Sequence, residues 1–597
     1  MKYPPIAHYA LIGDCHSAAL VSRAGSIDWC CLPRFDSDSC FGRLLDWRKG
    51  GYFEIAPLER AAVQREYLPN SLILVTTLTA GRRAARVIDF FAMRTGGRDR
   101  PRRELVRIIE GVRGRMRFSI RVEPRLDFGE VKPWIYSVAP DAHVAAGGST
   151  GLLIFGEAPL RCDSGHDLDA EVEVRSGQRL HLAVQFVPPA ELHATPTRAE
   201  ERARLAAHFD ETREWWSEWA SKLKYPEEGG VGVVRSAITL KALNYAPTGA
   251  IIAAPTTSLP ERIGGERNWD YRFSWIRDSV LTVHALSELG AEAEADGFRR
   301  FIQRSAAGNG DEVQVMYGVD GRRRLTEIDL DRLDGWRQSR PVRIGNAAAR
   351  QYQADMFGLV LELAWRWSER GKPIKDDITW KFLRDLVEIA IAKWRRADRG
   401  MWEVRSRPRH FVNSKVMCWA AVNRGIALAG QYGLPAPLAR WRRARAQIRG
   451  AIERRGFDRR RGIFVRSFGA SDLDATLLLL PSVQFVDWKD ERMMRTAEAI
   501  HRELTEDGLV MRYRSEDGLA GKEGVFVACT FWLAECFAHQ GRVRAARTLF
   551  DRACRCANDL GLFSEEYSPA RRQLLGNFPQ GLTHLAHISA SLALARA

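Results

Sequence analysis

The chain has 597 residues, of which 45% are hydrophobic and 27% charged, a globular composition that excludes a disordered or fibrous protein. This length is about four times the usual ~150 residues of one domain, so we expect two or three domains. The net charge of +16 is spread thinly along the chain. Basic runs such as Arg322–Arg324 and Arg459–Arg461 have acidic neighbours, which indicates solvated faces rather than a nucleic-acid groove.

Targeting signals and the spacing of cysteines indicate the cellular compartment of the protein. The N-terminus lacks the apolar segment of a signal peptide, and the apolar runs are far shorter than the ~18 residues of a membrane span. The ten cysteines follow no regular spacing and form no C-x-x-C pair. The sequence therefore predicts a cytoplasmic protein with reduced thiols and with neither a membrane nor a nucleic-acid partner. It carries no signal for an oligomeric state.

The first 200 residues have the periodicity of β-strands. Met116, Phe118, Ile120 and Val122 alternate with polar residues, the period-2 signature of a half-buried strand. The segment 180–186 repeats this pattern, and further β-rich segments lie near 72–80, 86–93, 105–112 and 152–156. We predict an antiparallel β-sandwich over residues 1–200.

The pattern changes to helical beyond residue 200. Residues 201–228 are charged, carry Trp215, Trp216 and Trp219, and predict a linker helix. From residue 229 to 597 the apolar residues recur with a period of 3.6. Helices are predicted at 229–245, 276–290, 292–305, 346–370, 376–397, 410–430, 436–453, 470–480, 488–504, 524–540, 542–559 and 579–596.

Twelve helices without intervening strands exclude a TIM barrel, which needs eight strands. A helical solenoid would show a fixed sequence period, and none is visible. The pattern favours a closed double ring of six inner and six outer helices over residues 229–597. The loops with unusual residues could then gather at one rim, where function usually resides.

Several kinds of chemistry lack a sequence signal. The chain has no phosphate-binding loop, no strand-linked G-x-G-x-x-G, no H-E-x-x-H and no G-x-S-x-G. His584 and His587 lie three residues apart on a predicted helix, but no third ligand accompanies them. We therefore predict no cofactor and no metal site.

The segment from Arg267 to Asp278 concentrates four aromatic residues, two aspartates and three arginines at the start of a predicted helix. Arg277 and Asp278 offer a fork of donors beside two acceptor oxygens, a pair that can hold vicinal sugar hydroxyls. The alternative is a structural ion pair that caps the helix.

Two further loops each carry a candidate catalytic carboxylate. Glu403 directly follows Trp402, and desolvation by an indole raises the pKa of a carboxyl group and suits it to general-acid work. Glu565 lies in a Ser-Glu-Glu-Tyr run, where hydroxyl groups can keep a carboxylate ionised and aimed at a water. Either residue alone would most often be an exposed surface group, but together they supply the pair that glycoside hydrolysis requires.

The whole chain resembles bacterial glycoside hydrolase family 15, the glucoamylase and trehalase family. The run from Tyr9 to Asp36 is similar to the trehalase-type N-terminal domain of that family. The later motifs occur in the family's order: Arg267 to Asp278, Pro341 to Asn346, Gly400 to Glu403, Glu523-Gly-Val-Phe with Cys529-Thr-Phe-Trp532, and Leu562 to Gln580.

The resemblance implies an N-terminal antiparallel β-sandwich followed by an (α/α)6 barrel. It also implies an inverting exo-hydrolase that needs no cofactor and releases glucose from the non-reducing end of an α-glucoside. Glu403 matches the general acid and Glu565 the general base. The expected substrate-binding residues are Arg277 and Asp278, which match the pair that grips the terminal glucose, together with Trp275, Trp269, Trp402 and Arg512.

The chain departs from fungal glucoamylases at Val404, where those enzymes carry a second acid that contacts the leaving-side sugar. With the missing signal peptide and starch-binding module, this favours a small α-glucoside such as trehalose, isomaltose or a maltooligosaccharide. Inversion predicts that the carboxyl groups of Glu403 and Glu565 lie ~6.5–9.5 Å apart. Two alternatives stay open: a disaccharide phosphorylase, marked by a second cationic cluster beside Glu565, and a catalytically silent sugar-binding protein.

Overall fold

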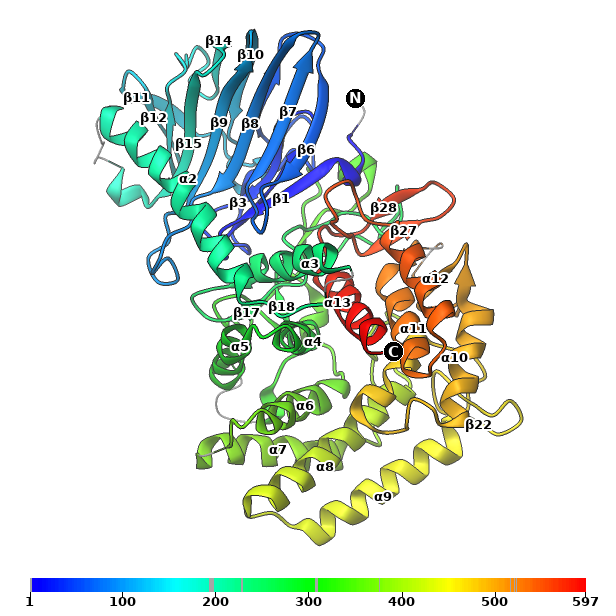
Figure 1. The fold of residues 1–597 in the computed structure, drawn as a ribbon. Helices are drawn as coiled ribbons and strands as arrows, with labels where there is room; N and C mark the ends of the chain where they lie inside the picture. Colours follow the sequence, from blue (N-terminus) through cyan, green and yellow to red (C-terminus); the bar gives the residue numbers. More distant parts are fainter. Residues whose placement is uncertain are drawn as a thin grey trace.

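The computed structural model describes residues 3–192, 198–226, 229–305, 310–374, 376–515, 517–519, 521 and 523–597. Two β-sheets stand at one end of the molecule and a group of helices at the other (Figure 1). The long helix α2 (Arg198–Ser221) runs along the flank of the sheets and leads into the helical part.

The β part consists of two antiparallel sheets. The seven-stranded sheet has the order β1-β2-β3-β5-β10-β14, with β4 paired to β3, and the eight-stranded sheet has the order β11-β12-β13-β15-β9-β8-β7-β6. The strands are β1 (Tyr9–Gly13), β2 (Ala18–Ser22), β3 (Ser26–Cys31), β4 (Ser39–Phe41), β5 (Tyr52–Pro57), β6 (Ala62–Tyr67), β7 (Leu74–Ala80), β8 (Arg83–Phe91), β9 (Glu104–Arg113), β10 (Arg115–Glu123), β11 (Trp134–Ala139), β12 (Ala142–Gly147), β13 (Thr150–Gly156), β14 (Leu168–Arg175) and β15 (Arg179–Val187).

Alternation of residue types explains how the sheets pack. Met116, Phe118, Ile120 and Val122 on β10 are all buried in the core between the sheets, as their period predicts. The outer face of the eight-stranded sheet is also apolar, and Leu205 of α2 packs into a cluster on that face. The predicted antiparallel sandwich is confirmed, with α2 as its cover.

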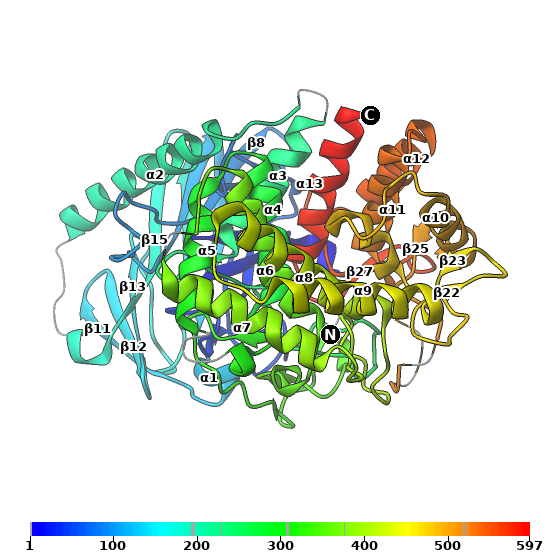
Figure 2. The same ribbon diagram turned by 90° about the horizontal axis from the view of Figure 1, so that it is seen from below.

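The helical part forms a closed double ring. The inner ring runs in contact order through α4 (Ile276–Glu288), α6 (Asp355–Glu369), α8 (Val412–Tyr432), a 3-10 turn at Ala475–Leu479, α11 (Val527–His539) and α13 (Gly581–Arg596), which returns to α4. The outer helices are α3 (Gly230–Ala242), α5 (Glu292–Ser305), α7 (Asp377–Lys393), α9 (Leu438–Arg455), α10 (Glu491–Leu504) and α12 (Val543–Cys554). In Figure 1, α7, α8 and α9 lie at the end away from the sheets, and in Figure 2, which looks from below, they lie in front. This is the (α/α)6 arrangement expected from the sequence.

Two predicted helices are wrong in detail. The fourth inner position, predicted as a helix over 470–480, is the 3-10 turn Ala475–Leu479 followed by a second one at Pro481–Val483. Asp474 caps the first turn by accepting a hydrogen bond from the Thr476 N–H. Pro481 supplies no N–H to continue a helix, so the segment stays short. The helix predicted over 346–370 is likewise a 3-10 turn at Ala347–Arg350 separated from α6.

All ten cysteines are free thiols, and most of them are buried. Within the part of the chain that the structure describes, no helix combines the length and apolar character needed to cross a bilayer.

A half-buried carboxyl group in the ring affects the stability of the fold. Burial raises the pKa of Glu535 on α11 to about 7, above the ~4.3 of an unfolded chain. The folded protein therefore binds this proton more tightly, and the resulting stability is full below pH ~4 and lost as the pH rises through 7. We expect Glu535→Gln to raise the free energy of unfolding by about 1–3 kcal/mol at pH 8 and hardly at pH 4. Denaturant unfolding of both proteins at the two pH values checks this; an equal change at both would contradict it.

Candidate active site

Glu403 is held in an unusual backbone conformation in the loop after α7. Its φ is +58°, in the left-handed region, and its N–H donates to the carbonyl of Gly400 over 3.2 Å. Gly400 also has a positive φ, and a Cβ there would lie 2.8 Å from the ring of Phe411. Strain of this kind persists only where surrounding structure enforces it, and it clusters at functional sites.

The side chain of Glu403 is placed by the start of α4. The Trp275 indole N–H donates to its Oε1 over 2.7 Å, and Arg277 Nη1 lies 3.7 Å from the same oxygen. Burial raises the pKa of Glu403 more than these two contacts lower it. A carboxyl group with a raised pKa keeps its proton, as a general acid must.

Glu565 is more deeply enclosed, with 1% of its surface exposed. The Tyr271 hydroxyl donates to Oε1 over 2.5 Å, whereas Oε2 is buried and bonds to no described residue. A Cβ at residue 576 would lie 2.5 Å from Oε2, so Gly576 permits this close approach. Burial raises the pKa of Glu565 to about 7, and the Tyr271 hydrogen bond opposes that rise.

The segment from Tyr271 to Trp275 contacts both Glu403 and Glu565. Tyr271 bonds Glu565, Trp275 bonds Glu403, and the two rings meet edge to face with centroids 5.4 Å apart. The structure therefore brings together two residues that the sequence separates by 162 positions, and it does so through the predicted Arg267–Asp278 cluster.

Arg277 and Asp278 form the expected pair at the start of α4. Arg277 Nε donates to Asp278 Oδ1 over 2.7 Å, and its Nη1 donates to the carbonyl of Met401. Asp355, at the start of α6, lies near this pair, and burial raises its pKa to about 7. Both members of the pair are thus fixed beside the Trp-Glu loop.

The remaining predicted residues lie around these groups. Trp402 donates from Nε1 to Asp474 over 2.9 Å, and the guanidinium of Arg512 lies 5.2 Å from its ring centroid. Trp269 is half-buried with two guanidinium groups, those of Arg343 and Arg405, each 4.6 Å from its ring. Trp275 is 1% exposed, and its indole N–H donates a hydrogen bond to the Glu403 carboxyl group.

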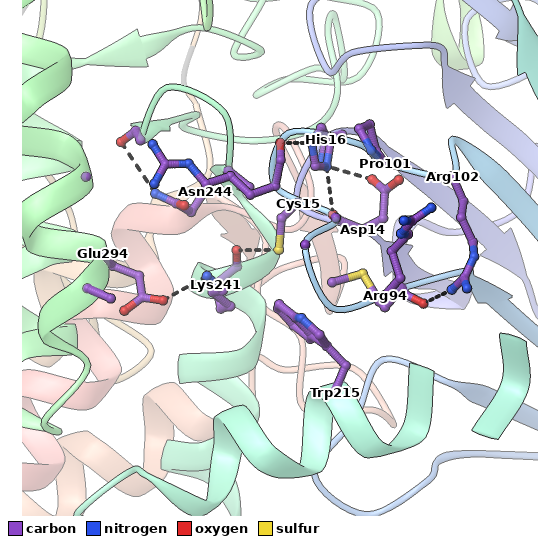
Figure 3. A pocket seen from close by; sticks show the side chains of 18 of the residues that line it. Asp14, Cys15, His16, Arg94, Pro101, Arg102, Trp215, Lys241, Asn244 and Glu294 are labelled. Atoms are coloured by element: carbon purple, nitrogen blue, oxygen red, sulfur yellow. Dashed lines mark hydrogen bonds and ion pairs between the residues drawn. The ribbon is translucent and has the colours of Figure 1, made fainter. Parts of the chain in front are cut away.

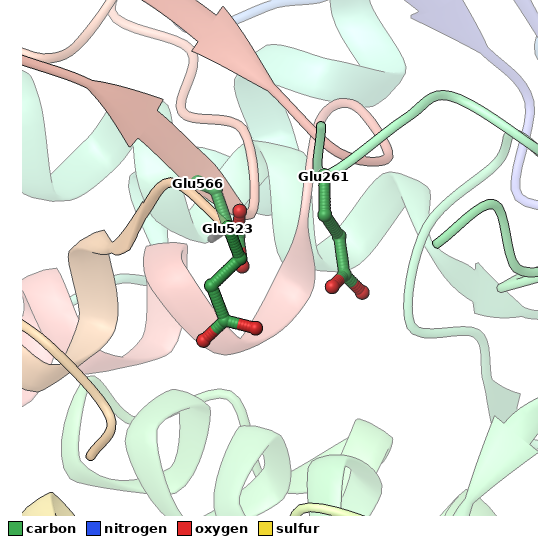
Figure 4. A group of neighbouring side chains, drawn as sticks. All are labelled: Glu261, Glu523 and Glu566. Atoms are coloured by element: carbon green, nitrogen blue, oxygen red, sulfur yellow. The ribbon is translucent and has the colours of Figure 1, made fainter. Parts of the chain in front are cut away.

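Three glutamates lie together behind Glu565: Glu261, Glu523 and Glu566 (Figure 4), with one carboxylate oxygen of each within 4.8 Å of the others. Arg512 bonds Glu523 through both Nε and Nη2, and Arg267 Nη1 bonds Glu523 over 3.0 Å. Burial and the mutual repulsion of the carboxylates raise the pKa values of Glu261 and Glu566 well above normal. Arg512 and Arg267 supply positive charge to this cluster, and the raised pKa values mean that Glu261 and Glu566 hold protons more readily than exposed carboxyl groups do.

His584 and His587 serve the core. Both Nδ1 atoms bond the Ser236 hydroxyl, over 2.9 and 3.0 Å, and burial lowers both pKa values. They are therefore neutral groups that pack in the core.

Sequence reasoning did not single out Tyr271, Glu261 or Asp355. Tyr271 lies inside the aromatic cluster, and a tyrosine four residues before Trp275 was the available signal. Glu261 and Asp355 have no distinctive local pattern, because only the fold buries them beside charged partners.

We expect Tyr271→Phe to move the pH dependence of activity. Its hydroxyl stabilises the ionised form of Glu565, so its removal raises the pKa of that group further. A base must be ionised to act, and the acidic limb of kcat/KM should shift to higher pH. A pH profile of the variant checks this, with Tyr432→Phe on the exposed end of α8 as a control. An unmoved acidic limb would show that Tyr271 does not tune Glu565.

Two carboxyl groups with raised pKa values beside an Arg–Asp pair, in a double ring of helices that follows a β-sandwich, are the features of a glycoside hydrolase. The family model "Glycosyl hydrolases family 15" matches residues 229–592, and "Trehalase-like, N-terminal" matches residues 1–159. The chain belongs to glycoside hydrolase family 15.

The similarity to known proteins covers nearly the whole chain. A trehalase of Mycolicibacterium smegmatis is 40% identical, covering 100% of this chain and 92% of its own. A trehalase of Thermoplasma volcanium is 36% identical, covering 98% and 93%. Among solved structures, a bacterial glucoamylase complexed with acarbose has a TM-score of 0.74 at 12% identity, covering 100% of this chain and 95% of its own. This structural likeness bears on the fold alone.

Proposed function

We propose that the protein hydrolyses trehalose with inversion at the attacked anomeric carbon. The observation that carries this is Glu565, whose Oε1 is fixed by Tyr271 while its buried Oε2 has no described partner. An oriented carboxylate with one free oxygen can accept a proton from a water held against the sugar.

The roles follow from the two environments. Glu403, with its raised pKa, protonates the glycosidic oxygen as the bond to the departing glucose breaks. Glu565 takes a proton from the water that attacks the opposite face of the retained ring. Arg277 and Asp278 hold hydroxyls of the retained glucose and so orient its anomeric carbon.

The charges behind Glu565 favour water over phosphate as the nucleophile. Arg512 and Arg267 are the nearby cations, but Glu523 pairs with both, and Asp517 binds Arg267 through two oxygens at 2.7 and 2.9 Å. Glu261 and Glu566 add further carboxyl groups. A phosphate dianion there would meet acidic groups rather than free cations, which argues against a phosphorylase.

The choice of trehalose rests on two supports. The relatives that cover the whole chain carry the name trehalase. Val404, at the position of the fungal second acid, is 3% exposed, so it offers no carboxylate to a longer glucan.

The substrate is tested by measuring kcat/KM for trehalose, isomaltose and maltotriose under identical conditions. We expect the value for trehalose to exceed the others by at least about tenfold, the lower end of what a difference of one small group contributes to discrimination. A higher kcat/KM for maltotriose would assign the protein to the glucoamylase side of its family. Turnover of none of them would support the silent-binder alternative.

A further inference from the structure

Cavities outside the proposed active site differ in whether their polar groups have partners. At the seam between the sheets and the helical ring (Figure 3), Lys241 in the cavity wall pairs with Glu294 over 2.8 Å. A larger cavity, of about 390 Å³, lies between α5, α6 and α7, and its volume is typical of small-molecule sites. We call it the α5–α7 cavity. Two N–H donors at its wall lack acceptors.

The α5–α7 cavity lies at the end of α6 that is remote from the sugar-binding residues. Asp355 begins α6 near Arg277, whereas Trp367, about three turns further along the helix, lines the cavity. The middle of α5, the connection between α6 and α7, and the first half of α7 complete the wall (Figure 1). None of the catalytic or sugar-binding residues proposed above lines it, so the two sites are separate.

Apolar side chains from all three helices form most of the wall. They are Ile302 of α5, Val360 and Leu363 of α6, Ile374 of the connection, and Phe382 and Leu383 of α7. Such a wall binds hydrocarbon or aryl groups because contact removes apolar surface from water on both sides. The occupant that fits this wall therefore has an apolar body.

The two N–H donors without acceptors are close together. The indole Nε1 of Trp367 and the guanidinium Nε of Arg299 are both buried, and neither bonds to a described residue. The guanidinium carbon of Arg299 lies 4.3 Å from the centroid of the Trp367 ring, so the two side chains are stacked. A buried N–H without an acceptor is costly, so a ligand that supplies an acceptor here is favoured over an empty cavity.

The other charged groups of the lining are already compensated. Lys372 pairs with Asp296 over 3.0 Å. Asp376 precedes α7 and caps it, because its carboxylate accepts from the N–H and from the hydroxyl of Thr379, each over 2.7 Å. These groups therefore leave little charge for a ligand to balance.

Arg299 is the cation that remains. Its Nη1 donates to the neutral side chain of Gln303 over 3.2 Å, and no carboxylate in the described part of the chain lies within ion-pair distance of it. A carboxylate ligand carries one negative charge and two acceptor oxygens, which match one guanidinium and the indole N–H of Trp367. A neutral sugar would leave the positive charge uncompensated, and an amine would add to it.

We propose that the α5–α7 cavity is a binding site for a small carboxylate with an apolar body, a medium-chain aliphatic or an aryl acid. Its carboxylate would accept hydrogen bonds from Arg299 and Trp367, and its body would lie against the apolar wall. The bound molecule would join α5 to α7 at the remote end of α6. This site is independent of the proposed hydrolysis and of the glucoside that is cleaved.

Titration calorimetry of the full-length protein tests the binding. The probes are octanoate, octan-1-ol, which has the chain without the charge, and acetate, which has the charge without the chain. We expect octanoate to bind at least about tenfold more tightly than either, since a charge-assisted contact and apolar burial are both needed. Equal binding of octanol would overturn the carboxylate assignment. No octanoate binding up to about 1 mM, the weak end of the affinity scale, would overturn the site.

Two variants test the two donors. Arg299→Gln should weaken octanoate binding at least about tenfold. Trp367→Phe keeps the aromatic ring and removes its N–H, so it should weaken binding about two- to tenfold, the effect of one neutral hydrogen bond. Arg300→Gln, at the exposed neighbour on α5, is the matched control and should leave binding unchanged. Unchanged octanoate binding in Arg299→Gln would overturn the proposal.

Hydrogen exchange locates the bound molecule, since a ligand slows exchange in the segments that it joins. Octanoate should protect amides of α5, of the end of α6 and of the start of α7 in the wild type, and should lose this effect in Arg299→Gln. Protection confined to other parts of the chain would place the carboxylate elsewhere and overturn the site. Neither calorimetry nor exchange needs turnover, so failure of the proposed trehalose hydrolysis would be seen separately.

Discussion

Glu403→Gln is expected to lower kcat on trehalose by about 10²–10⁴-fold, the usual contribution of a general acid. Glutamine keeps the shape of the side chain but has no proton to give to the glycosidic oxygen. The loop conformation should persist, because it depends on Gly400 and on backbone contacts of residue 403 rather than on its charge.

A substrate whose leaving group needs no proton distinguishes a variant that has lost the general acid from one that has lost its fold. Fluoride departs from α-glucosyl fluoride without a proton, so the Glu403→Gln variant should hydrolyse this compound at a rate near that of the wild type. Glu498→Gln, a change of the same type on the exposed face of α10, is the control and should keep kcat on both substrates. Wild-type activity of Glu403→Gln on trehalose would refute its role.

Glu565→Gln is expected to lower kcat on trehalose as much as Glu403→Gln does. Unlike Glu403→Gln, it should not be rescued by a substrate whose leaving group needs no proton. Without a base the water is not activated, so both trehalose and α-glucosyl fluoride should be hydrolysed about 10²–10⁴-fold more slowly. The acidic limb of the pH profile, which in the wild type reflects a pKa raised to about 7 by burial, should also disappear. Retained hydrolysis of the fluoride would show that another group serves as the base.

The two variants together form a discriminating pair. Rescue by the fluoride for residue 403 and no rescue for residue 565 is the outcome that assigns acid and base. The reverse pattern would exchange the two roles.

Periodicity predicted most of the strands and helices because the spacing of apolar residues along an element decides which of its faces is buried. The alternation in β10 and the apolar stripe of α7 each specify which face meets the core. The helix predicted at the fourth inner position was wrong because Leu477, Leu478 and Leu480 are apolar in either conformation. The capping by Asp474 and the missing N–H of Pro481 favour short turns there.

The sequence indicated the candidate site residues but not the contacts between them. Motifs singled out Glu403 and Glu565, yet the hydrogen bond from Tyr271 to Glu565 joins residues 294 positions apart in the sequence. Trp275 was expected to contact sugar, and the structure shows its indole N–H on the carboxyl of Glu403. Such contacts depend on tertiary packing, which leaves no local pattern.

The stereochemistry of the first products tests the central claim most directly. Proton NMR of purified protein with trehalose, recorded before mutarotation, resolves the two anomers of glucose. Inversion attacks one ring and leaves the other unchanged, so we predict equal initial amounts of β-glucose and α-glucose. α-Glucose alone would indicate retention and contradict the proposed roles of Glu403 and Glu565.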